Sequence, residues 1–276
     1  MLSLDLPFLL QKFNSLGMDY ILNGLSYVRG PIATVVGVLW TFFISVLVIL
    51  VATVTSSPRP IDFISIHLWA RFILWMSGVE LEVRGRENVQ PGGKGFLILF
   101  NHSSNFDIPA LFLFPRSFRF GAKVELFKIP FFGRAMAMCG VLPIDRGNRN
   151  KVMRVYDSAI SRIEQGECFA LAPEGTRQNE PKIGTFKRGP FDFALNAKAD
   201  LVPVVLAGVY EVLPKKAFLV NTGKWKRKVI MEILPRVPTH GLTAEQLDPV
   251  VQKVRDEVEA VFSRNHAEVM SATAPG

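Results

Sequence analysis

Seven residues, NHSSNFD from Asn101 to Asp107, place a histidine and a carboxylate five positions apart, directly after an apolar run. A carboxylate that accepts a hydrogen bond from one imidazole nitrogen leaves the other nitrogen free to remove a proton. His102 and Asp107 are therefore candidates for a general base and its orienting partner, with a substrate hydroxyl in the place of a triad serine. On one continuous helix the two side chains would point about 140° apart. They can meet only if His102 lies on a turn and Asp107 in the first turn of a helix.

Simpler explanations of the same residues stay open. Ser104-x-x-Asp107 fits the capping-box pattern, which would explain the aspartate without any catalysis. A lone histidine is more often a hydrogen-bonded loop residue than a base. Ser103 and Ser104 stand next to His102, but no GxSxG turn surrounds either of them, which argues against a serine nucleophile.

A second polar patch, PEGTR, follows another short apolar run and offers Glu174, Gly175, Thr176 and Arg177. Glycine lets the backbone approach a ligand closely, and arginine presents a planar fork that suits phosphate. The alternative is a tight turn that a surface pair of Glu174 and Arg177 closes.

Two more cations follow candidate strands. Lys123 comes after an apolar segment, and Arg146 stands in GVLPIDRG just beyond another. Either residue alone would pass as an ordinary surface charge. Several cations that converge near a histidine would instead form an anion site.

From Val79 onward, short apolar runs alternate with helical patterns, which indicates an α/β domain. Ligands of open α/β sheets bind at the carboxyl ends of the strands, so these patches should meet at one edge. We predict strands over 79–84, 95–100, 117–122, 141–144, 168–171, 201–206 and 229–234. We predict helices over 108–113, 151–164, 190–197 and 249–264, the last followed by a tail of small residues.

The N-terminal region is strongly apolar, and no charged residue occurs between Arg29 and Arg59. The run from Ile32 to Val54 would be about 34 Å long as a helix, enough to cross a hydrocarbon core of about 30 Å. A spanning helix, a helix pair that dips into one leaflet and a cleaved signal peptide are the three interpretations. The run is too long and too far from Met1 for a signal peptide, and its length favours spanning. We expect an interfacial helix before it, ending at a Gly30-Pro31 break.

Three regions result. Residues 1–60 are predicted to form membrane-associated helices, residues 61–78 an amphipathic linking helix after the Ser- and Pro-rich break, and residues 79–270 the catalytic domain. His67 in the linking helix is interpreted as structural or interfacial.

The net charge of +8 and pI of about 9.6 admit nucleic acid or anionic lipid as partners. The apolar segment makes a membrane surface the simpler explanation, without nucleic acid. The cluster 224–228 mixes lysines and arginine with Trp225, which suits a headgroup interface or a solvated hairpin turn. Cys139 and Cys168 lack metal-ligand spacing and are expected to be reduced core residues.

The order of these patches resembles the PlsC-type glycerolipid acyltransferase family, the 1-acyl-sn-glycerol-3-phosphate acyltransferases, over roughly residues 79–214. NHSSNFD is similar to its NHxxxxD block, GVLPIDRG to the second block, PEGTR to the third and LVPVV to the fourth, and AKVELFKIPFFG to the segment before the second. The chain departs from the family at Ala172, where an aromatic residue is frequent, and at Leu142-Pro143. These departures leave substrate choice more open than reaction type.

The resemblance implies an α/β fold with a mixed central sheet flanked by helices and an N-terminal hydrophobic membrane-binding region. It implies that His102, held by Asp107, deprotonates the sn-2 hydroxyl of lysophosphatidic acid, which then attacks acyl-CoA or acyl carrier protein to give phosphatidic acid. In this scheme Lys123, Arg146 and Arg177 bind the phosphate, while residues 174–176 shape the acceptor pocket. No metal, cofactor or covalent acyl-enzyme is expected.

The resemblance also implies a membrane protein whose catalytic domain faces the cytoplasm, with membrane lipids as partners. Two alternatives remain. A related enzyme would use another lyso-lipid acceptor, such as lyso-ornithine lipid. A non-catalytic membrane protein would use the basic patches to bind anionic lipid.

Overall fold

The computed structural model describes residues 6–55, 57–90 and 92–273, with side chains from residue 17 onward. The first residues of the predicted N-terminal region, Ser56 of the break and the end of the small-residue tail lie outside these ranges.

A seven-stranded sheet in the order β1-β7-β6-β2-β5-β3-β4 forms the centre of the described chain. Every neighbouring pair is parallel except β6 and β7, which run antiparallel. Five parallel strands therefore end at one edge, namely β6, β2, β5, β3 and β4. The strands are β1 (Val79–Arg84), β2 (Leu97–Phe100), β3 (Phe118–Lys123), β4 (Leu142–Ile144), β5 (Cys168–Leu171), β6 (Leu201–Ala207) and β7 (Arg227–Ile233).

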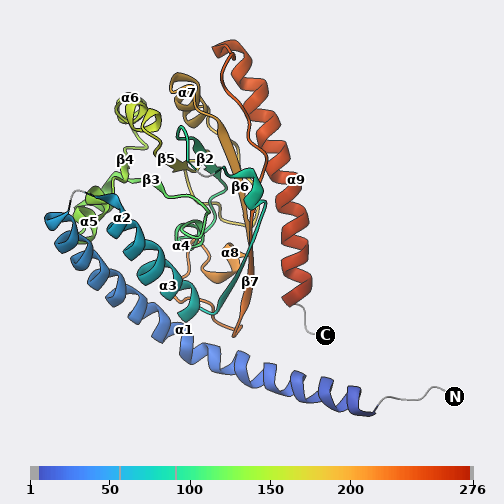
Figure 1. Ribbon diagram of the computed structural model, residues 1–276. Coiled ribbons are helices and arrows are strands. Elements are labelled where there is room, and N and C mark those ends of the chain that lie inside the picture. Colours follow the sequence, from blue (N-terminus) through green and yellow to red (C-terminus); the bar gives the residue numbers. More distant parts are fainter. Residues whose placement is uncertain (1–5, 56, 91, 274–276) are drawn as a thin grey trace.

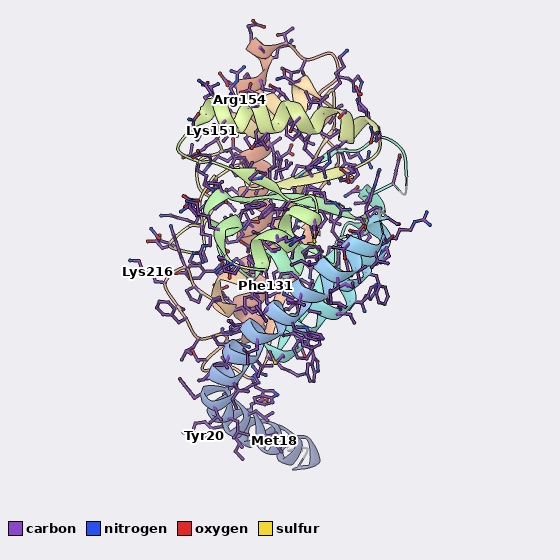
Figure 2. The ribbon with its side chains drawn as sticks, turned by 90° about the vertical axis from the view of Figure 1, so that its left-hand side faces the viewer. Met18, Tyr20, Phe131, Lys151, Arg154 and Lys216 are labelled. Atoms are coloured by element: carbon purple, nitrogen blue, oxygen red, sulfur yellow. The ribbon has the colours of Figure 1, made fainter. Side chains whose placement is uncertain are left out.

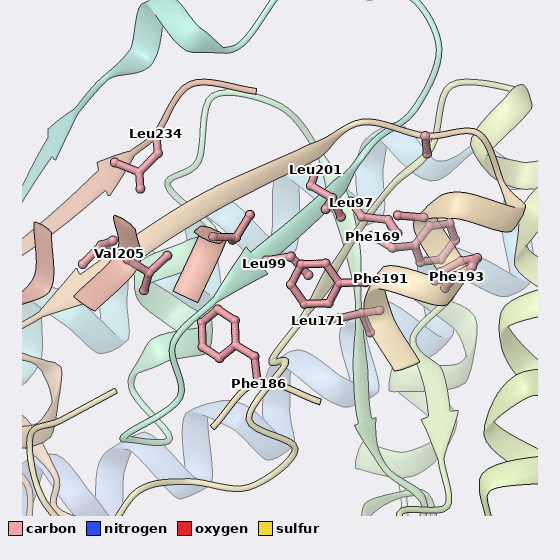
Figure 3. Close-up of a cluster of buried hydrophobic side chains, with 14 of the residues drawn as sticks. Leu97, Leu99, Phe169, Leu171, Phe186, Phe191, Phe193, Leu201, Val205 and Leu234 are labelled. Atoms are coloured by element: carbon pink, nitrogen blue, oxygen red, sulfur yellow. The ribbon is translucent and has the colours of Figure 1, made fainter. Parts of the chain in front are cut away.

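Alternating side chains of the central strands supply two separate cores. Leu97 and Leu99 of β2 face one cluster, and Ile98 and Phe100 face the other. Because successive side chains of a strand point to opposite faces, an all-apolar strand must be covered on both sides. Figure 3 shows part of the first cluster, where Phe191 and Phe193 pack beside the residues of β2 and β5.

Helices cover both faces of the sheet (Figure 1). The first core takes side chains from α6 (Arg149–Glu164), α7 (Gly189–Asn196) and α9 (Leu247–Thr273). The second core takes them from α3 (Arg71–Met76), α4 (Asp107–Leu111) and α8 (Val209–Val212). The shorter elements are α5 (Phe132–Met138) and the 3₁₀ turns η2 (Arg86–Asn88), η3 (Val124–Lys128) and η4 (Ala244–Gln246).

All seven predicted strands are present, each with its ends within two residues of the prediction. The prediction for the last helix was wrong at its end, because α9 continues to Thr273. Val269 is buried in the core, and Glu268 binds Arg84 and Lys228 of the sheet, so contacts beyond Arg264 extend the helix. The two short helices α5 and α8 were not predicted, since neither is long enough to show a helical period.

The N-terminal break was also predicted wrongly. A single helix, α1 (Leu6–Val54), runs through Pro31. Proline removes one backbone hydrogen bond and bends a helix without always ending it. Figure 1 shows α1 changing direction near its middle. The part of α1 from Gly17 to Val54 is long and apolar enough to cross a membrane by length and composition.

The segment after α1 folds back against it as α2 (Pro58–Phe63), a π-helical stretch η1 (Ile64–Ala70) and α3. Two tryptophans, Trp40 of α1 and Trp69 of η1, each donate a hydrogen bond to the other segment. The indole of Trp40 in α1 donates to the carbonyl of Leu68 at 2.9 Å, and the indole of Trp69 donates to the hydroxyl of Thr41 at 2.9 Å.

Polar contacts also fix α1 to the loop before β7. The guanidinium of Arg29 lies 4.2 Å from the Trp225 ring centre, and the amide of Trp225 donates to Asn23 at 2.9 Å. The Val220 amide donates to Thr34 at 3.1 Å. The part of the chain that contains the sheet therefore holds α1 along much of its length.

Candidate active site

His102 and Asp107 meet at the carboxyl end of β2. His102 lies on the loop after the strand and Asp107 is the first residue of α4, which is the geometry that the five-residue spacing required. The distance from His102 Nδ1 to Asp107 Oδ2 is 2.7 Å. Asp107 is fully buried, and the His102 side chain is 13 % exposed. The predicted pairing is confirmed.

Asp107 Oδ2 holds the loop as well as the imidazole. It also accepts hydrogen bonds from the backbone amides of Ser103 at 2.9 Å and Ser104 at 3.0 Å. An acceptor-only carboxylate at Nδ1 makes that nitrogen the protonated one, so the lone pair of the ring belongs to Nε2. Asp107 thus sets both the orientation and the tautomer of His102.

The capping-box explanation is half right. Asp107 accepts from the Ser104 amide as the pattern requires, but the hydroxyl of Ser104 accepts from the Phe106 amide at 3.1 Å. That hydroxyl also donates to the Leu213 carbonyl at 2.8 Å. Both hydrogen bonds join the Ser104 hydroxyl to backbone groups, so this hydroxyl has a structural role.

Asn101 fixes the point where the loop leaves the sheet. Its side-chain amide donates to the Leu206 carbonyl at 2.9 Å and accepts from the Leu206 amide at 2.7 Å. The Asn101 side chain thus forms two hydrogen bonds to β6, in place of the backbone hydrogen bonds that one more paired residue of β2 would form. Sequence reasoning did not select Asn101, although an asparagine directly after a fully apolar strand is a visible signal.

Glu174 clamps the same loop from β5. One carboxylate oxygen accepts from the His102 amide at 2.9 Å, and the other accepts from the Gly184 amide at 3.1 Å. Burial raises the pKa of the Glu174 carboxyl, while these amides and Gln178 act in the opposite direction. The family resemblance implies that Glu174 shapes the acceptor pocket. Its carboxylate instead points into the protein, and this hydrogen bonding makes it a positioning residue.

Two lysines from later in the chain, Lys187 and Lys215, contact the rest of the PEGTR loop. Gly175 adopts a φ of 70°, and a Cβ there would lie 2.9 Å from Lys187 Nζ, so the lysine side chain crosses directly over this glycine. Thr176 is exposed. The carbonyl of Arg177 accepts a hydrogen bond from Lys215 Nζ at 2.6 Å. Lys187 and Lys215 were missed because neither follows a strand, and only the fold brings them here.

Arg146 and Arg177 lie close enough to interact. Removal from solvent lowers the pKa of the Arg146 guanidinium, and the positive charge of Arg177 acts in the same direction. Glu125 opposes both effects. Lys123, at the end of β3, lies 3.4 Å from Glu125. Two arginines that repel each other at the edge of the sheet where His102 lies form a site that an anion would stabilise.

Two further observations concern metal-ligand clusters and hollows among the described residues. No group of three or more His, Cys, Asp or Glu side chains is arranged to hold a metal ion among them. A hollow of about 670 Å³ lies at the opposite edge of the sheet, near Pro58, Arg116 and Arg119. It opens beside the amino ends of β3 and β5, away from His102.

Sequence comparisons with known proteins find acyltransferases among the relatives of this chain. The family model described as Acyltransferase matches residues 80–207. The yeast 1-acyl-sn-glycerol-3-phosphate acyltransferase is 27 % identical over 87 % of this chain and 78 % of its own length. The human alpha form is 29 % identical over 81 % of this chain and 77 % of its own. The chloroplastic LPAT1 of Arabidopsis thaliana is 28 % identical over 65 % of this chain, and the chain spans about half of it, 49 %.

A solved structure shares the fold. The crystal structure of the 1-acyl-sn-glycerophosphate (LPA) acyltransferase PlsC from Thermotoga maritima superposes with a TM-score of 0.73 and 22 % identity. The alignment covers 88 % of this chain and 98 % of that one. The mixed α/β fold that the sequence predicted is confirmed.

Glu174→Gln tests the clamp on the histidine loop. An amide has only one carbonyl oxygen, so either the His102 or the Gly184 backbone amide would face an NH₂ group. We expect a loss of about 1–3 kcal/mol in the free energy of unfolding, measured by denaturant titration in micelles. Glu180→Gln, at a side chain that is 67 % exposed, is the control and should change it by no more than about 0.5 kcal/mol. Equal effects of the two substitutions would contradict the clamp.

Proposed function

The chain belongs to the acyltransferase family, and on that premise we propose that it transfers a fatty acyl group from an acyl thioester to the sn-2 hydroxyl of lysophosphatidic acid. The product is phosphatidic acid, an intermediate of phospholipid biosynthesis. The observation that carries the proposal is the His102–Asp107 pair, which lies at the same edge of the sheet as Arg146 and the PEGTR loop. The names of the relatives supply the acceptor.

His102 Nε2 acts as the general base in this reaction. It removes the proton of the sn-2 hydroxyl, and the alkoxide oxygen forms a bond to the thioester carbonyl carbon. The tetrahedral intermediate collapses by breaking the carbon–sulfur bond, and the thiolate leaves with the proton that the imidazolium returns. Asp107 stabilises the imidazolium between these two steps without taking its proton.

The cations have a binding role. Arg146 and Arg177 hold the phosphate of the acceptor, and Lys123 and Lys187 add to the positive field. An anion between the two arginines also removes their mutual repulsion. The donor is acyl-CoA or acyl carrier protein, and both thioesters imply that the site faces the cytoplasm.

The chain associates with a membrane, and we propose that α1 lies along the surface. Asn23, Arg29 and Thr34 contact the loop before β7, and Ala52 near the far end of α1 lines the same hollow as Arg119. The contacts span roughly 44 Å of helix, at 1.5 Å per residue. A helix that crossed a core of about 30 Å would carry the attached domain into the hydrocarbon. This argument favours an association with one leaflet, as in the helix-pair alternative, over the spanning helix that length alone favours.

His102→Ala should lower kcat by about 10²- to 10⁴-fold, the usual contribution of a general base. Transfer of a labelled acyl group to lysophosphatidic acid by the purified protein measures it. His67→Ala, at an exposed histidine outside the site, is the matched control and should retain full activity. Near-normal turnover by a folded His102→Ala protein would contradict the mechanism, and so would absence of turnover in the unaltered chain.

Arg177→Ala should raise KM for lysophosphatidic acid by about tenfold or more, with a smaller change in kcat, because a charged hydrogen bond to phosphate is lost. Lys187→Met should act in the same direction. A lyso-acceptor without a phosphate should show no such change. Lys182→Met, at a lysine that is 60 % exposed and paired with Glu180, is the control. An equal KM increase for both acceptors would argue against phosphate binding.

The orientation of α1 is tested by single cysteines at Asp19 and Arg59, which flank the apolar stretch. A membrane-impermeant maleimide should label both positions from the same side of sealed vesicles. A spanning helix would expose them on opposite sides. The unaltered chain is the blank, because burial raises the pKa of the Cys139 thiol to about 11 and also raises the pKa of Cys168.

A further inference from the structure

The segment that joins β3 to α5 exposes large apolar side chains on the surface. Leu126 is 38 % exposed, Ile129 is 46 % and Phe131 is 50 %. They lie within six consecutive residues, separated by Phe127, Lys128 and Pro130, and we treat them as one patch. We call Leu126, Ile129 and Phe131 the apolar loop.

The backbone at Phe131 is held in an uncommon conformation. Its φ is 61°, and the Phe132 amide donates to the Pro130 carbonyl at 2.7 Å, which closes a three-residue γ-turn. This turn is rare and strained for a residue with a side chain. Strained backbone persists where its surroundings or its function require it. Here the strain keeps an aromatic ring at the surface.

The apolar loop continues the exposed face of α1. The ring of Phe131 meets the ring of Phe42 edge-on, with 5.1 Å between centres. Phe42 itself is 50 % exposed, and Leu39, one turn earlier, is 63 % exposed. Figure 2 shows Phe131 on the same face of the molecule as α1. A surface that accommodates α1 therefore also reaches the loop.

Unpaired cations border this patch. Lys128 and Arg134 are exposed, and no hydrogen bond or ion pair involves either side chain among residues 17–55, 57–90 and 92–273. An exposed apolar patch with a basic rim suits the boundary between anionic headgroups and acyl chains. A protein partner would have to match the patch and the apolar helix together, whereas a lipid surface accommodates both.

We propose that Leu126, Ile129 and Phe131 form a second membrane-inserting element, carried by the catalytic domain and seated in an anionic lipid monolayer. The segment that carries the apolar loop begins directly after Lys123, whose ammonium lies 3.4 Å from Glu125. The apolar loop therefore follows closely in the chain after one of the cations proposed to bind phosphate. This last step rests on the proposed function, because it makes the loop the route by which a lipid acceptor reaches the site without leaving the leaflet.

Photo-crosslinking of the full chain tests the insertion without any activity measurement. The photoreactive residue p-benzoyl-phenylalanine replaces Phe131, Leu39 or Lys253 in separate variants, each reconstituted with vesicles of phosphatidylcholine and phosphatidylglycerol. Lys253 is 75 % exposed on α9, on the other side of the sheet from α1 (Figure 1). After irradiation, mass spectrometry counts phospholipid adducts. We expect strong adducts at positions 131 and 39 and background at 253.

The outcomes separate the loop from the rest of the proposal. Adducts at 39 without adducts at 131 would overturn insertion of the loop and leave membrane association through α1 intact. No adduct at either position would contradict both. An adduct yield at 131 that does not fall when phosphatidylcholine replaces phosphatidylglycerol would overturn the anionic surface as the partner. The same photoreactive residue at Ile129 gives a second reading if the variant at 131 does not fold.

Discussion

The geometry of the site depends on a single buried oxygen atom, Asp107 Oδ2. It accepts from the imidazole of His102 and from two backbone amides of the loop between them. A charged acceptor with three donors is a strong constraint in an interior from which water is excluded. Glu174 holds the other side of that loop through the His102 amide. Two carboxylates, Asp107 after β2 and Glu174 after β5, thus fix His102. The two loops that carry them are therefore held to each other.

The parallel arrangement of β2, β5, β3 and β4 explains why distant residues share one site. Each strand delivers the residues after it to the same edge, so Arg146 and the PEGTR loop arrive at the edge where His102 lies. The sequence was sufficient to predict this edge, because buried parallel strands appear as short apolar runs. It was sufficient for the histidine–aspartate pair as well, since one spacing and one turn define it.

Other parts of the structure depend on contacts that no local pattern contains. Glu174 faces inward because two backbone amides from separate loops require an acceptor, and sequence order does not show them. Lys187 reaches Gly175 only through the fold. Pro31 stays within α1 because tertiary contacts on both sides support the helix, against the local preference of Gly30-Pro31 for a break. The extension of α9 depends in the same way on Glu268 and its partners in the sheet.

The position of β1 has a consequence for the order of folding. This strand emerges first during synthesis, yet its neighbour in the sheet is β7, the strand that emerges last. Pairing across so long a stretch of chain is slow, because the loop must close before the contact forms. Until then the newly made domain presents an unpaired strand edge, which is prone to aggregation. Completion of the C-terminal third of the chain is therefore the step that commits the whole sheet to its native topology.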